Sequence, residues 1–446
     1  MKIELPEKVH RIITTLQSHG YEAYAVGGCV RDSILGRTPG DWDITTLATP
    51  LETKALFSRT FDTGIEHGTI TVLLDKEGFE VTTYRIDGEY EDSRHPKDVK
   101  FTRSLEEDLK RRDFTINAMA YNEESGLVDI FGGMEDLEKR IIRCVGNAKE
   151  RFSEDALRIL RAVRFSAQLD FDVEEKTREA ICMLAPNLRN ISAERIQVEL
   201  VKLLISPHPE RIRIAYELGI TKVILPEFDR MMETGQETPH HCYNVGEHTI
   251  QTMRSISPEK VLRLTMLFHD MGKPAAKTVD EKGRAHFIGH ANISEELTKE
   301  ILHRLKFDND TLRKVTRLVR FHDYRMPPQP KYVRRAMNRI GEDLFPYYIL
   351  VQRADIAGQS EYHKKKKIAN LDEVERMYHD IMEKKQCVSL KGLAVTGRDL
   401  LEIGAEPGPQ IGQILEKLLK EVIEEPEYNQ KEILLKMVKD WLDETK

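Results

Sequence analysis

The sequence predicts an α+β protein, in which a mixed β-sheet with helices occupies the first part and helices make up the rest. Residues 1–140 alternate strand-like and helix-like stretches. From about Glu106 onward the pattern becomes mainly helical, punctuated by Pro186, Pro207 and Pro226. No run of about 18 apolar residues occurs, so no membrane span is expected.

The composition is that of an ordinary globular protein. The chain has 446 residues, 32% of them charged, which is long enough for two to four domains. A net charge of -7 does not indicate a nucleic-acid-binding protein, although a local basic face could still bind nucleic acid. The N-terminus carries acids and no apolar core, so no secretory signal is expected. Five scattered cysteines without a CxxC pair argue against zinc ribbons and disulfides, and favour the reducing cytoplasm.

The first elements surround a glycine turn. Residues 24–26 are predicted to form a strand, and residues 30–36 a short helix after Gly27 and Gly28. Residues 41–46 are expected to form the next strand, and a hairpin is expected at residues 68–85, around a turn at Asp75.

The glycine turn is a candidate phosphate site. Gly27 and Gly28 let the backbone approach a ligand, and the following helix start presents N–H groups to an anion. Arg31 adds a cation for a phosphate. The alternative is a tight strand-to-helix turn without a ligand.

Three carboxylates form the next candidate site. On a strand, Asp41 and Asp43 would project from one face, where like charges repel unless cations bind them. Glu80 lies opposite the apolar face of its own strand and could be a third ligand, or an exposed strand acid. Three carboxylates near a phosphate-binding turn indicate two-metal phosphoryl or nucleotidyl transfer.

These motifs together resemble one family. GGCVRDSILGRTPGDWDITT, residues 27–46, is similar to the signature of class II tRNA nucleotidyltransferases and bacterial poly(A) polymerases. Residues 111–118 and 154–158 resemble its later motifs, in the same order. The resemblance implies a nucleotidyltransferase head, Mg²⁺ on Asp41 and Asp43 with Glu80 assisting, and a nucleotide-binding motif that contributes Arg112, Asp113 and Asn117.

Residues 154–165 are predicted to form one helix that carries a row of polar side chains. Asp155, Arg158, Arg161 and Arg164 recur every three residues, and such a row drifts around the helix. Asp155 and Arg158 can therefore act together, whereas Arg164 should point elsewhere. A surface ion pair is the alternative for Asp155 and Arg158.

The Asp155–Arg158 pair could select the incoming base. Asp offers only acceptors and Arg only donors, which suits the amino group and ring nitrogen of cytosine and of adenine. Uracil and guanine would place a carbonyl oxygen against the carboxylate, at a cost of roughly 1–3 kcal/mol. The resemblance implies this kind of protein-templated selection.

Three features favour addition of CCA to tRNA over the other activities of the family. Ala156 stands where the related poly(A) polymerases tend to have proline, and the C-terminus is not strongly basic. Residues 87–100 resemble the flexible loop of CCA-adding enzymes, which CC-only enzymes lack. An A-adding tRNA nucleotidyltransferase and a poly(A) polymerase remain alternatives.

A histidine-rich block follows from residue 240 to about 355. Its His248, His269–Asp270 and Asp355, with His290 and His322 between, resemble the HD superfamily. The resemblance implies a metal site of His248, His269, Asp270 and Asp355, for Mn, Ni, Fe or Mg, in a phosphohydrolase module. The alternatives are an inherited scaffold that carries the tRNA, and a phosphohydrolase as the main activity.

The predicted domains are a head at residues 1–140, a helical neck at 141–230, an HD body at 231–385 and a helical tail at 386–446. The glycine-rich segment 396–415 in the tail could offer N–H groups to phosphates, or simply pack as helix, turn and helix. The expected partners are tRNA, ATP and CTP, with no membrane, and the oligomeric state stays open.

Overall fold

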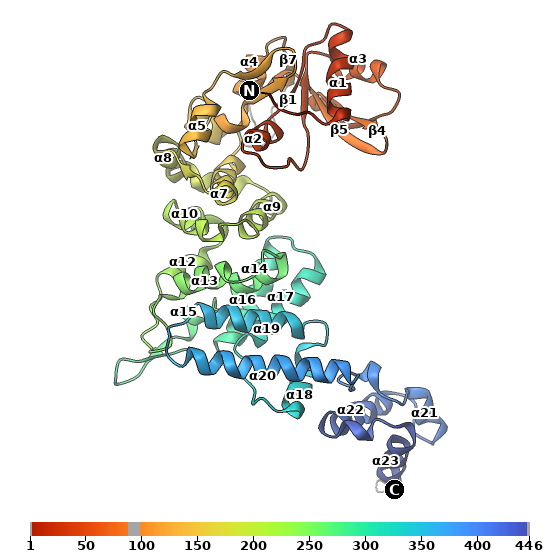
Figure 1. Ribbon diagram of the computed structural model, residues 1–446. Helices are drawn as coiled ribbons and strands as arrows, with labels where there is room; N and C mark the ends of the chain where they lie inside the picture. The colour runs from red at the N-terminus through yellow and green to blue at the C-terminus, as the bar shows by residue number, and fades with distance from the viewer. Residues whose placement is uncertain (1, 88–98, 444–446) are drawn as a thin grey trace. The chain divides into compact units, whose positions relative to one another are not determined.

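The computed structural model describes residues 2–87 and 99–443, which fold as two compact units, Met1–Pro226 and Glu227–Lys446 (Figure 1). Most of the loop expected at residues 87–100 lies outside the described residues. The four predicted domain boundaries stay a prediction.

A seven-stranded mixed sheet forms the centre of the first unit. Its strands in spatial order are β3 (Thr60–Gly64), β4 (Thr69–Leu74), β5 (Glu77–Thr83), β2 (Ile44–Thr46), β1 (Ala23–Val26), β8 (Met119–Asn122) and β9 (Gly126–Asp129). Only β2 and β5 pair in parallel, with Ile44 opposite Val81. Strands β6 (Arg85–Asp87) and β7 (Val99–Phe101) form a separate, antiparallel two-stranded sheet.

The β4–β5 hairpin follows its sequence signals. Asp75 and Lys76 both have positive φ angles, 48° and 70°, as a two-residue hairpin turn with right-handed strand twist requires. On β5 the side chains of Phe79, Val81 and Thr83 are buried, while Glu80 between them is exposed. The predicted facing of Glu80 away from the core is confirmed.

Two sequence expectations for the sheet were wrong. The strand expected at residues 41–46 begins only at Ile44, so both aspartates lie in the connection before β2. Strands β8 and β9 lie where a helix was expected. They could not be recognised from the sequence, because they are short and their residues show no clear alternation of buried and exposed side chains.

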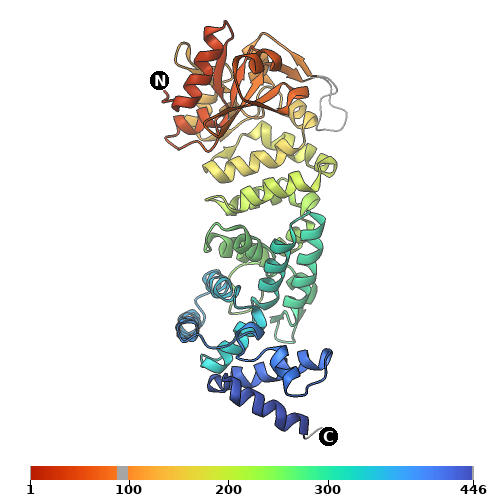
Figure 2. The ribbon, with the colours of Figure 1, turned by 90° about the vertical axis from the view of Figure 1, so that its right-hand side faces the viewer.

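Helices flank the sheet and continue beyond it within the first unit. They are α1 (Glu7–Ser18), α2 (Gly28–Ile34), α3 (Pro50–Leu56), α4 (Leu105–Lys110), α5 (Gly133–Lys139), α6 (Ala148–Glu154), α7 (Leu157–Leu169), α8 (Glu175–Leu184), α9 (Ala193–Leu204), α10 (Ile212–Glu217) and α11 (Thr221–Ile224). Helices α7 and α9 lie side by side (Figure 2). A parallel pair, β10 (Ile141–Ile142) and β11 (Asp172–Val173), corrects the expectation of an all-helical neck.

The second unit is almost entirely helical. Its helices are α12 (Pro226–Met232), which begins at the boundary, α13 (Val245–Arg254), α14 (Lys260–Phe268), α15 (Lys273–Ala276), α16 (His290–Arg304), α17 (Asn309–Phe321), α18 (Pro330–Ile340), α19 (Phe345–Ala357), α20 (Lys364–Glu383), α21 (Gly397–Glu402), α22 (Pro409–Glu424) and α23 (Lys431–Asp443). A small hairpin, β12 (Thr278–Val279) and β13 (Ala285–His286), interrupts them.

Apolar side chains of the last three helices form a core of their own, which includes Leu400, Leu418, Val422, Leu434 and Val438. Within the described residues, no helix combines the length and the apolar character that crossing a membrane requires.

Candidate active site

The three predicted head carboxylates gather where β2 begins, beside the middle of β5. Asp43 directly precedes β2 and is anchored there, because its carbonyl accepts a 2.9 Å hydrogen bond from the Val26 N–H. The parallel register of β2 and β5 sets Asp43 beside Glu80, one residue before the Ile44–Val81 pair. The register of the sheet therefore brings together two carboxylates that are 37 positions apart in the sequence. The expectation that Asp41 and Asp43 would lie on one face of a single strand was wrong, because both precede the strand.

The electrostatics of this cluster are repulsive. Asp43 and Glu80 reach solvent but have protein on several sides, and this partial desolvation raises the pKa of both carboxyls. The charge of Asp41 raises both further, as does that of Asp43 on Glu80, whereas Arg112 lowers the pKa of Asp43. A divalent cation would relieve this repulsion.

The donor set suits such a cation. Asp41, Asp43 and Glu80 offer only oxygen ligands, the kind that Mg²⁺ prefers. Among the described residues, the groups whose ligand atoms lie within 4.8 Å of one another are in the second unit, so these three carboxylates are more widely spaced. They fit a metal that also takes ligands from water and substrate.

The glycine turn lies against Arg112. Gly27 has a φ of 85°, and a Cβ atom there would come 3.1 Å from Nη1 of Arg112. Helix α2 follows this turn but has only seven residues, so its N-terminus alone is a weak anion site. Arg112 adds a positive charge at the same place. Glycine at position 27 thus allows both the backbone turn and the close approach of the guanidinium.

A chain of polar contacts joins three of the sequence motifs. Arg31 donates to Oδ1 of Asn117 at 2.6 Å, and Nδ2 of Asn117 donates to Oδ1 of Asp113 at 3.0 Å. Arg161 on α7 then pairs with Oδ2 of Asp113 at 2.6 Å. Burial opposes ionisation of Asp113, but Arg161 and Asn117 together hold the pKa of its carboxyl well below the usual range. The head and α7 are therefore connected by a buried, charged network.

Asp108 holds the two arginines of the second motif. This fully buried carboxylate accepts from Arg111 at 2.9 Å and lies 3.5 Å from Arg112. It also accepts a 3.0 Å hydrogen bond from the Thr45 hydroxyl on β2. The two arginines are thereby tied to the strand that follows Asp43.

The expected helix at 154–165 is broken at Asp155. Helix α6 ends at Glu154, Asp155 has extended backbone angles (φ -137°, ψ 101°), and α7 begins at Leu157. The sequence predicted Asp155 and Arg158 as neighbours on one helix face. Because of the break, they are not. The Asp155 carboxylate instead accepts from the Leu157 N–H at 3.0 Å and pairs with Arg195 at 2.7 Å.

Arg158 is held by a different set of partners. It pairs with Glu154 at 2.7 Å and donates to the carbonyls of Arg151 and Arg111 at 3.1 and 2.8 Å. Asp155 and Arg158 are thus each positioned separately, which prevents them from neutralising each other. This arrangement is compatible with a shared base template, and that role stays a prediction.

Arg164 points to another place, as expected from the drift along the helix. It pairs with Glu199 on α9 at 2.6 Å and stacks 3.8 Å from the centre of the Phe165 ring. Burial lowers the pKa of its guanidinium to about 10, although Glu199 counteracts this. Arg31 and Arg164 both line a cavity of about 490 Å³, together with Lys202 on α9.

Sequence reasoning missed Asp108, Arg195 and Glu199. Glu199 had a signal, because it lies three residues after Ile196 and four before Leu203, on the apolar face of α9. A carboxylate at such a position requires a buried partner. Arg195 and Asp108 gave no comparable signal, since their partners are tertiary contacts.

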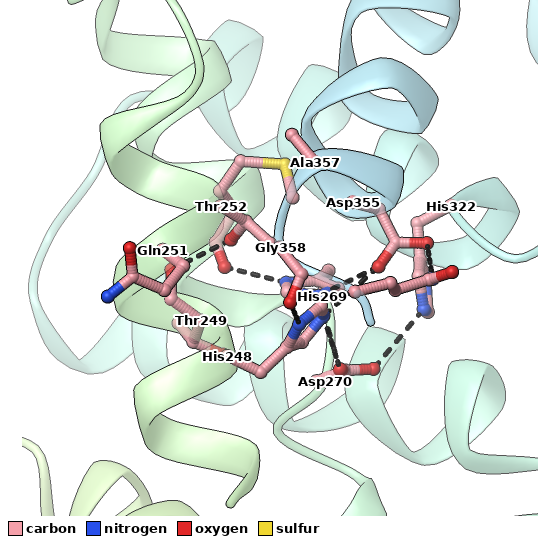
Figure 3. A network of polar contacts seen from close by, with 12 residues as sticks. His248, Thr249, Gln251, Thr252, His269, Asp270, His322, Asp355, Ala357 and Gly358 are labelled. Atoms are coloured by element: carbon pink, nitrogen blue, oxygen red, sulfur yellow. Dashed lines mark hydrogen bonds and ion pairs between the residues drawn. The ribbon is translucent and has the colours of Figure 1, made fainter. Parts of the chain in front are cut away.

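In the second unit, six buried residues converge, and Figure 3 labels all of them except His290. The four predicted HD ligands lie together: Nε2 of His248 is 3.1 Å from Oδ1 of Asp355, and Nε2 of His269 is 3.2 Å from Oδ2 of Asp270. His290 and His322 join them, 3.4 and 3.5 Å from Oδ1 of Asp270. The HD domain assignment stays a prediction, but the ligand set is brought together by α13, α14, α16, α17 and α19.

Fold and site define the chain as a nucleotidyltransferase of the poly(A) polymerase head type, and the model of the "Poly A polymerase head domain" matches residues 23–143. A model for the RNA- and SrmB-binding region of polymerase A matches residues 170–232, and one for domain 2 of tRNA nucleotidyltransferases matches residues 278–438. The chain belongs to the family of CCA-adding enzymes, because relatives of that name align with it from end to end.

The CCA-adding enzyme of Leuconostoc mesenteroides is 34% identical over 449 residues, covering 100% of both chains. That of Levilactobacillus brevis is 36% identical over 444 residues, covering 99% of this chain and 100% of its own. The crystal structure of the Bacillus stearothermophilus CCA-adding enzyme in complex with CTP is 28% identical, with a TM-score of 0.72 and 99% coverage of both chains. Membership of this family implies dependence on a divalent metal.

Proposed function

We propose that this chain adds C, C and then A to the 3′ end of tRNA, using CTP and ATP and releasing pyrophosphate. The observation that carries this proposal is the full-length relation to CCA-adding enzymes, in a chain that retains the head carboxylates and both nucleotide motifs. We infer that the reaction takes place in the cytoplasm, in keeping with the free cysteines.

In each step the terminal ribose hydroxyl of the tRNA attacks the α-phosphate of the nucleotide. A new bond forms between that oxygen and phosphorus, the bond to the β-phosphate oxygen breaks, and pyrophosphate leaves. Asp41 and Asp43, with Glu80, would hold Mg²⁺, which when bound supplies charge neutralisation at the attacking and leaving oxygens. The same three side chains would orient the reacting groups at the start of β2.

The cations nearby would bind the rest of the nucleotide. Arg112 lies at the Gly27 turn and suits a phosphate, while Asp113 and Asn117 are placed in the network for the ribose. The network fixes these side chains before substrate arrives, which reduces the entropy cost of binding. Arg161 keeps Asp113 ionised, and the carboxylate in turn accepts hydrogen bonds from the Asn117 amide and the Phe114 N–H, which fixes the position of Asn117.

Base choice would rest on Asp155 and Arg158. A carboxylate has about four lone-pair sites, and Leu157 and Arg195 occupy three of those on Asp155. An amino group of cytosine or adenine can take a further site, whereas a uracil carbonyl would meet an acceptor. Arg195 also fixes the direction in which this carboxylate points.

Two other activities are less well supported. Poly(A) polymerase shares the head, but the full-length relatives described above are CCA-adding enzymes. A phosphohydrolase as the main activity is not favoured, because the family model of the polymerase head matches most of the sheet domain, and this domain is the part that transfers nucleotides.

The test is incubation of the purified chain with tRNAs that end before C74, before C75 and before A76, each with one labelled nucleotide. We expect CTP to be used by the first two tRNAs and ATP by the third, with UTP and GTP rejected. Extension of all three by ATP alone, or of none by CTP, would overturn the proposal.

A further inference from the structure

A basic cavity in the first unit lies apart from most of the predicted nucleotide site. Its volume is about 490 Å³, and it is lined by α2 and the segment that follows, by the C-terminal half of α7 and by the end of α9. Its wall does not include the head carboxylates, Gly27, Arg112, Asp113, or the pair of Asp155 and Arg158. An anion in this cavity would therefore meet a different set of side chains from those predicted to surround the incoming nucleotide.

The side chains around the cavity carry an excess of positive charge. Four cations line it, namely Arg31, Arg37, Arg164 and Lys202. The described residues contribute one carboxylate to the wall, Asp32, which pairs with Arg31 at 2.9 Å, and Glu199, which is not part of the wall, pairs with Arg164. Arg37 and Lys202 are both exposed, and neither forms an ion pair with a described residue. Two positive charges therefore stay uncompensated at the rim of the cavity.

The deeper part of the cavity is also positively charged. The guanidinium carbons of Arg31, Arg161 and Arg164 lie 5.0, 5.3 and 3.8 Å from the centre of the Phe165 ring. Burial, and after it the charges of Arg161 and Arg31, lower the pKa of the Arg164 guanidinium to about 10, although Glu199 raises it. The neighbouring carboxylates thus do not fully balance the positive charge around Arg164, and an anion in the cavity would.

The rest of the wall suits an organic phosphate. Thr38 and Ser206 offer hydroxyl groups, and a phosphate oxygen accepts hydrogen bonds from hydroxyl, ammonium and guanidinium donors. Leu169, Ile205 and Pro207 add apolar surface, which an inorganic ion does not use. A phosphate with a sugar attached, as in a polynucleotide, matches both parts of the wall.

The cavity is close to the place where the new bond forms. Thr38, in its wall, is three positions before Asp41, and three residues span at most about 11 Å. In the proposed reaction the ribose hydroxyl at the end of the tRNA reaches the head carboxylates, and the phosphates of that strand follow behind it. The phosphates of the incoming nucleotide are assigned to other groups, at Gly27 and Arg112. A phosphate in this cavity therefore belongs to the strand.

We propose that the cavity between α2, α7 and α9 binds a phosphodiester group of the tRNA strand that is being extended. Arg37 and Lys202 contact this phosphate at the rim, and Arg164 attracts it from the base of the cavity. The site holds the strand in position and takes no part in forming or breaking bonds. The proposal rests on the proposed CCA addition, because the strand is the substrate of that reaction. A phosphate of the nucleotide or of pyrophosphate is the other source of the same chemistry.

The first experiment compares the two substrates in steady-state kinetics, with a tRNA that ends before C74. Arg37→Ala/Lys202→Ala should raise the KM for tRNA about tenfold, while the KM for CTP and inhibition by pyrophosphate stay within about twofold of the parent. The slope of log KM for tRNA against log salt concentration should fall by about 1.4, which is about 0.7 for each of two contacts with a single strand. Both side chains are exposed, so thermal melting should not change.

The matched control is Lys176→Ala/Lys222→Ala, which removes two exposed lysines of the same unit that do not line the cavity. It should keep the parent's KM for tRNA and its salt dependence. Arg37→Lys/Lys202→Arg keeps both charges and should bind tRNA nearly as the parent does. A raised KM for CTP or weaker inhibition by pyrophosphate would overturn the assignment to the strand. An equal loss in the control, or no loss in the first variant, would overturn the site.

The second experiment measures equilibrium binding without any nucleotide, so it does not depend on catalysis. The tRNAs carry one uncharged methylphosphonate linkage, placed at successive positions near the 3′ end. We expect one position at which this change weakens binding to the parent but has no further effect on Arg37→Ala/Lys202→Ala, because both changes remove the same contact. Additive losses at every position would overturn the site, even in a chain that adds CCA normally. Absence of CCA addition with this position retained would instead contradict the proposed function alone.

Discussion

Asp43 is the residue on which nucleotide addition should depend most directly. It lies just before the start of β2, beside Glu80, and burial and the charge of Asp41 raise the pKa of its carboxyl. Asp43→Ala removes a metal-binding carboxylate, and we expect the addition rate to fall by at least about 1000-fold, since such metals supply several kcal/mol. The measurement is single-turnover incorporation of labelled CTP, with tRNA affinity measured alongside.

Glu66→Ala is a control for this change, because Glu66 is an exposed acid of the same unit outside the cluster. It should retain full activity. tRNA affinity of Asp43→Ala should stay within about twofold, as binding rests mainly on backbone contacts elsewhere. Substantial addition by folded Asp43→Ala would contradict the two-metal assignment.

Asp155 and Arg195 should both affect base choice, but to different degrees. Asp155→Ala removes the acceptor that faces a uracil carbonyl, and discrimination between CTP and UTP should fall by about 5- to 150-fold, corresponding to roughly 1–3 kcal/mol. Arg195→Ala leaves the carboxylate but frees its orientation, so a smaller loss is expected. Ratios of kcat/KM for the two nucleotides measure the effect.

Arg178→Ala provides a comparison, because Arg178 forms an ion pair with the partly exposed Glu217 and lies outside the motifs. Its selectivity should equal that of the wild type. If Asp155→Ala rejects UTP as before, Asp155 serves only to begin α7.

At the scale of elements, the turn between β1 and α2 can be tested by adding one carbon atom. Gly27→Ala places a Cβ atom in a left-handed region and 3.1 Å from Arg112, so both backbone strain and displacement of the guanidinium are expected. We expect a stability loss of about 1–2 kcal/mol and an increase of about tenfold in the KM for nucleotides. Calorimetry and steady-state kinetics measure the two effects.

Gly20→Ala separates the effect of backbone strain from the effect of displacing Arg112. Gly20 has a similar φ of 87°, but a Cβ atom there would meet nothing within 4 Å. It should therefore lose stability without a change in KM. An unchanged KM for Gly27→Ala would show that Arg112 does not bind the nucleotide.

Sequence patterns predicted the elements that follow local rules. The β4–β5 hairpin and α2 each carry turn residues that identify them. The break between α6 and α7 could not be predicted, because residues 154–165 contain no proline or glycine and read as one helix. Its cause is tertiary, since Asp155 is held in an extended conformation by Arg195, 40 residues away.

The sites show the same division. Motif spacing predicted two sets of residues, the head carboxylates and the HD-type histidines and aspartates, because both patterns are long and specific. The structure brings each set together, and the metal-binding roles stay a prediction. Motif spacing could not show that Asp43 and Glu80 become neighbours through parallel pairing, or that His290 and His322 complete a second triad. Such contacts depend on how separate elements pack.

At the scale of the molecule, the two candidate sites lie in different units and share no ligand. The His269→Ala/Asp270→Ala double variant should therefore add CCA at a rate within about threefold of the wild type, while it loses the metal binding predicted for the second unit. Incorporation assays and metal analysis on the same preparation measure both. Thermal melting must accompany them, because the changes remove two fully buried polar side chains.

The reciprocal variant completes the comparison. Asp41→Ala/Asp43→Ala should lose CCA addition and retain the metal binding predicted for the second unit. Loss of addition in the folded His269→Ala/Asp270→Ala variant would show that the two sites are coupled.

The buried network from Arg31 to Arg161 also limits how this enzyme can be recombined. A chimera that joined residues 1–140 to the neck of a distant homologue could leave the Asp113 carboxylate buried without its arginine. Breaking such a pair typically costs about 3–5 kcal/mol, a large part of the stability of a domain. Crossover points for domain shuffling should therefore lie after Pro226, where the first compact unit ends, so that the catalytic sheet and α7 are inherited together.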